Sequence, residues 1–212
     1  GKTLNVSMIQ RFFEKTDEDT SIYFADKKIW SCGEKYRKHQ GKYPVIFLTF
    51  KDVKFNTWEE SLEKIKEVLK NEFDRHKVIL TGSVLSEYDK LYYEKIMLKT
   101  ATIVELTGAL FNLSQMLHAY YQTAPIIIID EYDTLIQQGY LSGYYEQTVL
   151  FMRNLFSAGF KDNPHLSFGF MTGILRVTKE SIFSGMNNLK VNSIMENRYS
   201  EYFGFTKNEI LD

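Results

Sequence analysis

The chain is poor in cysteine and proline, with one Cys and three Pro among its 212 residues. A single cysteine, Cys32, excludes an internal disulfide and a zinc site built from several cysteines. The four histidines, at positions 39, 76, 118 and 165, follow no metal-ligand spacing, so we expect them to have structural roles. The sequence therefore gives no indication of a metal centre held by Cys or His.

Neither sign of charge predominates. The 26 basic and 27 acidic residues leave a net charge of -1, which provides no overall field for holding a nucleic acid. The densest basic stretch, KYRKHQGK (35–42), is expected to be a solvated loop, with a local basic patch as the alternative. No apolar run approaches the ~20 residues of a membrane span and no signal peptide is visible, so a cytoplasmic location is expected.

Short apolar runs alternate with helical patterns along the chain, which predicts an α/β fold with a mainly parallel sheet. The expected strands are 43–50, 126–130, 166–173 and 201–205. The expected helices are 4–14, about 57–76, 86–99, 102–122 and 144–159, with one or two helical turns over 178–184. Capping boxes support two of these helix starts, Thr57 with Glu60 and Thr102 with Glu105, and Ser86 and Asp89 lie near the start of the helix at 86–99. A loop containing Gly139 and Gly143 is expected between the strand at 126–130 and the helix at 144–159.

The stretch APIIIIDEYDTL (124–135) raises a specific question, because a strand apolar enough to be fully buried ends in carboxylates. Ligands of parallel sheets bind outside the carboxyl ends of the strands, which would put Asp130 and Glu131 at a functional edge. On this stretch alone, a buried strand ending in a polar helix cap explains the pattern equally well. Asp133 is expected to cap the next helix, with positioning of Glu131 as the alternative.

The first residues, Gly1-Lys2-Thr3, lead into a predicted helix and match the end of a P-loop. In a P-loop the Lys reaches the β- and γ-phosphates and the hydroxyl binds Mg²⁺. Three residues alone are a weak signal, since such a triplet occurs by chance in about one chain in ten of this size. Combined with a buried strand ending in Asp-Glu, the triplet is far more specific. Asp130 would then hold the Mg²⁺ hydration shell together with Thr3, and Glu131 would polarise an attacking water.

Further residues have suitable chemistry for a phosphate site. The adjacent Asp-Glu pair favours hydrolysis over phosphoryl transfer to another substrate. Thr172, at the end of the next strand, would sense the γ-phosphate or orient the water, although a simple strand-to-turn Thr fits as well. Arg176 and Arg153 are candidates for neutralising transition-state charge, and each also fits a structural surface arginine.

Five segments carry a family resemblance: GKTLN, YPVIFLTFKD, IIIIDEYDTLI, FMTGILRVTKESIFSGMNNLK and RYSEYFGFTKNEI. Together they resemble the predicted AAA-ATPase-like family of bacteria and some anaerobic fungi, in which a P-loop ATPase domain is often followed by a PD-(D/E)XK nuclease-like domain.

The resemblance implies a P-loop fold of the additional-strand type, with sheet order 5-1-4-3-2. Its Walker A residues fall on Gly1, Lys2 and Thr3, and its Walker B acid on Asp130. Its catalytic glutamate falls on Glu131. The sensor position falls on Thr172 and the arginine of the TGILR segment on Arg176. ATP and Mg²⁺ are the implied cofactors.

The family's first strand and the first half of its P-loop have no counterpart in the sequence. We therefore expect a core over 1–205 and the start of a C-terminal lid or helical domain over 206–212, truncated at both ends.

Three functions compete at this point. The first is Mg-ATP hydrolysis that drives a conformational change in an attached, nuclease-like module, with self-association completing the assembly. The second is a nucleotide-responsive or purely structural scaffold with little hydrolysis. The third is the motor of a nucleic-acid-processing machine, which the near-neutral charge does not directly support.

Overall fold

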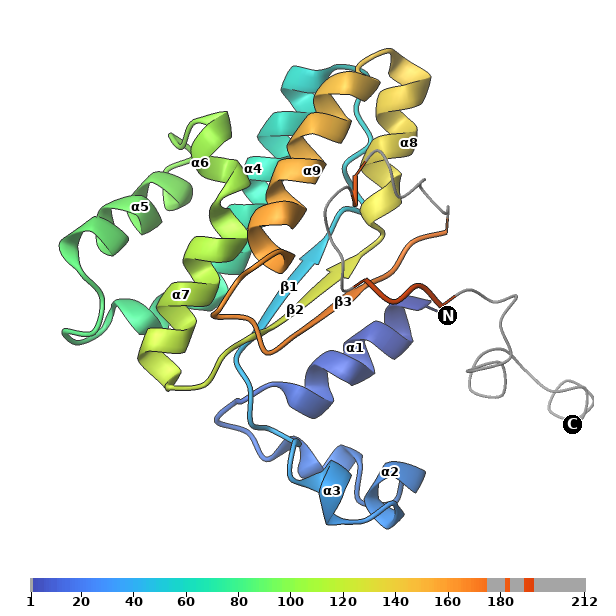
Figure 1. Cartoon of the computed structure of the whole chain (residues 1–212), viewed down its shortest axis with the longest axis vertical. Coiled ribbons are helices and arrows are strands. Elements are labelled where there is room, and N and C mark those ends of the chain that lie inside the picture. The colour runs from blue at the N-terminus through green and yellow to red at the C-terminus, as the bar shows by residue number, and fades with distance from the viewer. Residues whose placement is uncertain (1, 175–181, 184–188, 193–212) are drawn as a thin grey trace, which may run out of the picture.

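The computed structural model of the chain describes residues 2–174, 182–183 and 189–192. Within them a three-stranded parallel sheet is flanked by helices (Figure 1). None of the helices in these ranges is long and apolar enough to cross a membrane. The strand predicted at 201–205 and the helix start at 206 lie outside the described residues, as does most of 178–184.

The strands are β1 (Val45–Thr49), β2 (Ile126–Asp130) and β3 (Phe168–Met171), in the spatial order β1-β2-β3. The three matching predictions are confirmed, with shorter bounds for the first and third strands. Val45 pairs with Ile126, and Ile126 pairs with Phe168. Because the strands are parallel and in register, their carboxyl ends meet at one edge of the sheet.

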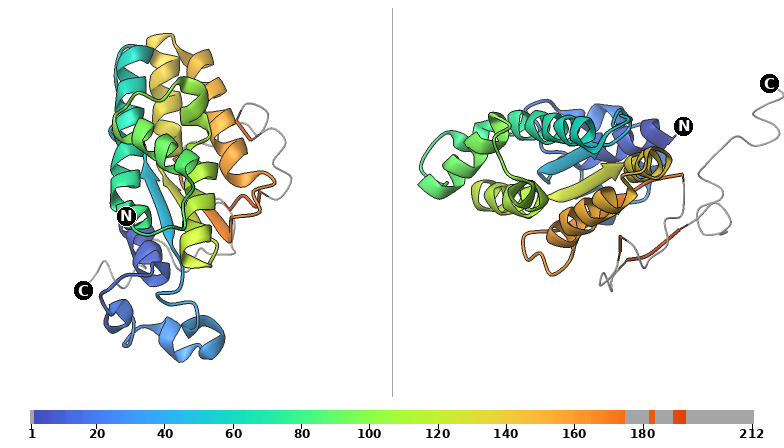
Figure 2. Two further views of the ribbon diagram at one scale, coloured as in Figure 1. Left: turned by 90° about the vertical axis from the view of Figure 1, so that its left-hand side faces the viewer. Right: turned by 90° about the horizontal axis from the view of Figure 1, so that it is seen from above.

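The central strand β2 is buried on both faces, as its apolar sequence predicts. Ile127 and Ile129 face a large core formed with α4 (Trp58–Arg75), α7 (Ala109–Tyr121) and α9 (Tyr145–Phe160). Ile126 and Ile128 face α1 (Lys2–Phe13), which lies across the opposite face of the sheet (Figure 2). The alternation of side chains along β2 thus decides which residues reach α1.

The prediction of a loop between the strand at 126–130 and the helix at 144–159 is wrong, because this segment forms the helix α8 (Tyr132–Ser142). Gly139 is a packing residue inside this helix. A Cβ at Gly139 would lie 2.6 Å from the Thr148 hydroxyl of α9, so glycine lets the two helices approach closely. Gly143 ends α8 at a φ of 83°, a left-handed conformation that glycine adopts without strain.

The single helix predicted over 102–122 is divided at Gly108 into α6 (Ile103–Thr107) and α7. The caps at Thr102 and Ser86 are confirmed as full capping boxes that start α6 and α5 (Glu87–Met97). Thr57 caps α4 by accepting the N–H of Glu60. The predicted helices at the start of the chain and at 144–159 are also confirmed, as α1 and α9.

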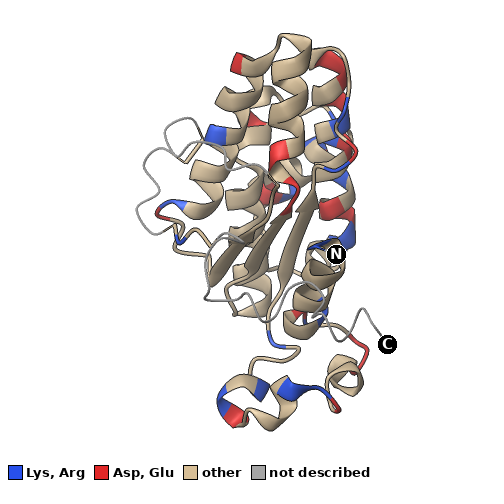
Figure 3. Cartoon of the chain, turned by 90° about the vertical axis from the view of Figure 1, so that its right-hand side faces the viewer, with Lys and Arg blue, Asp and Glu red and all other residues tan. Residues whose placement is uncertain are grey.

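Between α1 and β1 the chain forms a small lobe beyond the amino ends of the strands (Figure 2). The lobe contains three short helices, η1 (Thr20–Tyr23), α2 (Lys28–Ser31) and α3 (Glu34–Arg37). The basic stretch 35–42 begins in α3, so the expectation of a loop is only partly correct. Acidic and basic segments are interspersed along the helices (Figure 3). A further short helix, η2 (Lys77–Leu80), follows α4.

Candidate functional site

The carboxyl ends of the strands place polar residues on one face of the sheet. Asp130 is the Cα partner of Thr49, and Thr172 follows Met171, which pairs with Ile129. Side chains alternate along each strand, so Asp130 belongs to the same face as Ile126 and Ile128. That face is covered by α1, whose first residues are Lys2 and Thr3. The end of β2 and the start of α1 therefore meet at this edge (Figure 1).

Asp130 is nearly inaccessible, with 1% of its surface exposed. Burial and the nearby negative charge of Glu131 raise the pKa of the Asp130 carboxyl above its usual value. The positive charge of Lys2, the backbone N–H of Glu131 and the hydroxyl of Thr3 act on that pKa in the opposite direction. Lys2, Thr3 and Glu131 are thus the groups that act on the Asp130 carboxyl, and the four residues are called the Lys2–Asp130 cluster below.

Two buried atoms of this cluster, Lys2 Nζ and Asp130 Oδ1, have no hydrogen-bond partner in the part of the chain that the structure describes. Buried polar atoms are nearly always paired, so each such atom requires an explanation. An ammonium suits an anionic oxygen, and a carboxylate oxygen suits a cation. Mg-phosphate would satisfy both, because Mg²⁺ prefers hard oxygen ligands and is commonly bound through one or two carboxylates plus substrate phosphates.

Glu131 has an unusual backbone. Its φ of 51° and ψ of 43° place a non-glycine residue in the left-handed region, where the chain passes directly from β2 into α8. Such conformations cost about 1–3 kcal/mol and cluster at functional sites. The Glu131 side chain is half-buried and its Oε2 lies 3.5 Å from the Thr134 hydroxyl.

The end of β3 is held by backbone hydrogen bonds on two sides. The N–H of Thr172 donates to the carbonyl of Ile129 at 2.9 Å, and the Thr172 carbonyl accepts the N–H of Tyr132 at 3.3 Å. These bonds place Thr172 beside the β2–α8 junction where Asp130 and Glu131 lie.

Asp133 lies inside the first turn of α8 and is not its N-cap residue as expected, since the N-cap is Glu131, whose side chain makes no capping hydrogen bond. Asp133 is instead buried, and its Oδ2 accepts the backbone N–H of Ile174 at 2.7 Å. Sequence reasoning missed this contact. Its signal in the sequence is the second Asp of DEYD together with the Gly of MTG.

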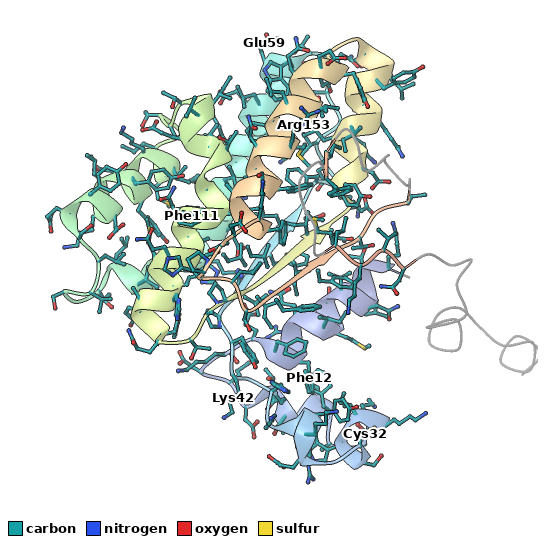
Figure 4. All side chains as sticks on the ribbon, in the orientation of Figure 1. Phe12, Cys32, Lys42, Glu59, Phe111 and Arg153 are labelled. Carbon is teal, nitrogen blue, oxygen red and sulfur yellow. The ribbon has the colours of Figure 1, made fainter. Side chains whose placement is uncertain are left out.

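Three further predicted residues are not among the groups that act on the pKa of Asp130 in the described structure. Gly1 and Arg176 lie outside the described residues. Arg153 is on α9, one of the helices that form the core beside the sheet (Figure 4). Across residues 2–174 and the two short described segments, no group of three or more His, Cys, Asp or Glu side chains could hold a metal. Within the cluster, the Thr3 hydroxyl and the Asp130 carboxylate are oxygen ligands of the kind that could hold Mg²⁺.

A cavity of about 670 Å³ lies at the amino ends of the strands, away from this cluster. Its lining includes Glu14, Val45, Arg75 and His76. Arg75 and Glu14 in this lining pair with each other, and Arg75 also pairs with Glu72. The candidate site is therefore the Lys2–Asp130 cluster.

Comparison with known proteins identifies the family of the chain. A protein described as "Uncharacterized protein in vnfD 5'region" from Azotobacter chroococcum mcd 1 is 29% identical over 100 residues. The match covers 47% of this chain but 19% of that protein, so the chain corresponds to a small part of this relative. No solved structure matches the chain. The family model described as a predicted AAA-ATPase matches residues 1–183, and the chain belongs to this AAA-ATPase-like family.

Proposed function

We propose that this chain binds Mg-ATP and hydrolyses it. The observation that carries the proposal is a pair of buried atoms, Lys2 Nζ and Asp130 Oδ1, that have no hydrogen-bond partner among the described residues. They belong to the start of α1 and the end of β2. An ammonium that lacks an anionic partner and a carboxylate oxygen that lacks a cationic one, buried in the same cluster, suit a ligand that carries both charges. Membership of a predicted AAA-ATPase family supports ATP as that ligand.

Each residue of the cluster has a role in binding. Lys2 contacts the β- and γ-phosphates, and the backbone N–H groups of Gly1 and of the first turn of α1 bind phosphate oxygens in this proposal. The Thr3 hydroxyl and the Asp130 carboxylate hold Mg²⁺ and its water ligands. When bound, the ion neutralises charge on the phosphate oxygens.

Glu131 is the general base in this proposal, and its carboxylate accepts a proton from the attacking water. The strained backbone at Glu131 supports this role, because such a conformation persists where the surrounding structure enforces it. Thr172 orients the water or contacts the γ-phosphate. Arg176 is the proposed source of positive charge for the transition state.

We further infer the full sheet order 5-1-4-3-2, because the adjacent β1-β2-β3 matches strands 2, 3 and 4 of that order. The proposed core spans 1–205 and a lid or helical domain begins at 206–212. Hydrolysis would drive a conformational change in an attached module, nuclease-like in type, with self-association of the ATPase domains. The alternative is a nucleotide-responsive or purely structural scaffold or interaction domain with little hydrolysis.

The test is phosphate release from Mg-ATP by the full-length protein, compared with Glu131→Gln. We expect wild type to turn over, and we expect the variant to bind ATP but to release phosphate at least ~10²-fold more slowly. Glu146→Gln, an exposed Glu in the first turn of α9, is the matched control and should retain wild-type turnover. If wild type and Glu131→Gln released phosphate at the same negligible rate, the proposal that this chain hydrolyses ATP would be wrong.

Thermal unfolding separates the scaffold alternative from a domain that does not bind nucleotide. ATP at 100 times its Kd should add ~2.7 kcal/mol to the free energy of unfolding. Lys2→Ala should abolish this gain, because it removes the ammonium that meets the phosphates. A wild type that ATP does not stabilise would contradict nucleotide binding altogether.

A further inference from the structure

The first turn of α8 is tied to the segment that follows β3. Asp133 has 1% of its surface exposed, and its Oδ2 accepts the backbone N–H of Ile174 at 2.7 Å. These residues are 41 positions apart in the sequence. A short hydrogen bond to a buried carboxylate is about twice as strong as one between neutral groups. The contact therefore holds the β3 exit firmly against α8.

Gly173, the residue before Ile174, also packs closely against Asp133. A Cβ at this position would lie 2.7 Å from Asp133 Oδ1 and 2.9 Å from a ring carbon of Tyr132. Real Cβ atoms essentially never approach so closely, so any larger residue would push the segment away from the carboxylate. Glycine is needed here for close packing on Asp133.

A second bond ties the residue before Gly173 to α8. The N–H of Tyr132 donates to the carbonyl of Thr172 at 3.3 Å. The two bonds to α8 thus fix both ends of the Thr172–Gly173–Ile174 segment. Tyr132 directly follows Glu131, so the proposed base and the proposed sensor are attached to the same turn of helix.

We propose that Asp133 is a positioning residue, which sets the place of Thr172 relative to Glu131 by holding the backbone of Gly173 and Ile174. This inference rests on the proposed ATPase function. Asp133 need not touch the nucleotide, and it acts through the segment it holds. Displacing a positioned group by about 1 Å can slow a reaction ~10²-fold, so loss of this contact should appear in the chemical step.

The test compares Asp133→Ala and Asp133→Asn in the full-length protein. Asp133→Ala should lower kcat for Mg-ATP hydrolysis by about 10- to 100-fold, with the KM for ATP changed by about twofold or less. The KM should stay near the wild-type value because the proposed ATP-binding residues Lys2, Thr3 and Asp130 take no part in the hydrogen bond between Asp133 and Ile174. Asp133→Asn retains an acceptor oxygen and should restore kcat to within about fivefold of wild type.

Two controls separate positioning from a loss of stability. Tyr93→Phe removes a buried hydroxyl that donates to the carbonyl of Phe73, on helices distant from the site, and should leave kcat unchanged. Amide hydrogen exchange should show faster exchange at Ile174 in Asp133→Ala and near-wild-type exchange in Asp133→Asn. Should Asp133→Ala not fold, Gly173→Ala should show the same fall in kcat, because it leaves the carboxylate in place and displaces the segment.

The outcomes are distinguishable. An active wild type whose kcat is unchanged by Asp133→Ala and Gly173→Ala would overturn the positioning role alone. The positioning role would also be wrong if Tyr93→Phe lowered stability and kcat as much as Asp133→Ala does. A wild type without ATP hydrolysis would overturn the proposed function, and the positioning role with it.

Discussion

The carboxylate of Glu72 in α4 accepts the backbone N–H of Phe47 in β1 at 2.8 Å. β1 is an end strand of the described sheet, so this N–H has no neighbouring strand to pair with there. The guanidinium of Arg75 bonds the carbonyl of Val45 on the same strand edge and also bonds Glu72. Two side chains of α4 thus occupy the backbone groups that a further strand would use, which protects this edge from pairing with another chain.

We therefore expect Glu72→Ala to lower the free energy of unfolding by about 3–5 kcal/mol. The change leaves the Phe47 N–H and one side of the Arg75 guanidinium without a partner, and breaking a buried charged pair costs about this much. Urea denaturation measures the effect. Glu63→Ala in the same helix removes an exposed ion pair with Lys66 and should cost less than about 1 kcal/mol. Equal losses in the two variants would contradict the role of Glu72.

The ion pair between Lys95 and Glu105 should make stability depend on acid pH. The hydrogen bond from Lys95, followed by bonds from the Thr102 N–H and hydroxyl, lowers the pKa of Glu105 from 4.5 to about 2. A carboxyl with a lowered pKa in the folded state contributes stability above its unfolded pKa and loses it as the pH falls. The contribution of Glu105 is thus complete above pH ~4.5 and is lost toward pH ~2.

The measurement is the melting temperature between pH 7 and pH 2 for wild type and Glu105→Gln. The difference between them should be constant at the higher pH and shrink between pH ~4.5 and ~2. Glu94→Gln, an exposed change on α5, is the control and should follow the wild-type curve. A difference that stays constant across the whole range would refute the assignment to Glu105.

Asp130→Asn should stabilise the protein in the absence of nucleotide. Burial and Glu131 raise the pKa of Asp130, so its ionised form is less favourable in the folded chain than in the unfolded chain. For a carboxyl with a raised pKa, stability is lost as the pH rises through the folded pKa, and a neutral amide removes that loss. At pH 7 we expect the melting temperature to rise by a few degrees, while stabilisation by Mg-ATP disappears.

Differential scanning calorimetry with and without Mg-ATP tests both parts. Asp52→Asn, at an exposed position after β1, should change neither the melting temperature nor the response to Mg-ATP. A nucleotide-free Asp130→Asn protein that melts below wild type would show that the carboxylate serves the fold rather than a ligand.

Gly159→Ala should destabilise the packing of α9 on α7. A Cβ at Gly159 would lie 2.8 Å from Leu110 Cδ1 and 2.9 Å from Leu110 Cβ, and the second atom is too near the backbone to move aside. Alanine gains about 1 kcal/mol in helix propensity, whereas overpacking a core costs about 1–3 kcal/mol. The clash should win, with a net loss of about 1–2 kcal/mol in urea denaturation. Ser157→Ala in the same helix should be near neutral, and stabilisation by Gly159→Ala would contradict the close approach.

Much of the fold was predictable because its signals are local. The bounds of β2 follow from four isoleucines that end in carboxylates, and the caps at Ser86 and Thr102 mark helix starts through neighbours three residues away. The helix α8 was not predictable in this way. Gly139 and Gly143 have the composition of a loop, and only contact with Thr148 on another helix shows that Gly139 belongs inside one.

The candidate site was likewise predictable only in part. Its residue types were predictable from sequence, since a buried parallel strand ending in Asp130 and Glu131 and a helix beginning with Lys2 and Thr3 suggest phosphate chemistry. The left-handed turn at Glu131 and the bond from Ile174 to Asp133 were not predictable. The roles proposed for Gly1 and Arg176 remain predictions from the sequence.

By itself, the sequence determined the strand and helix pattern and the chemistry available at the strand ends, because apolar periodicity, caps and residue type act over a few neighbouring positions. Only the tertiary structure decided that Lys2 and Asp130 share one buried edge, that Asp133 holds the exit of β3, and that Glu72 covers the edge of β1. Those relationships join residues far apart in the chain. They depend on how whole elements pack, and no short stretch of sequence specifies that packing alone.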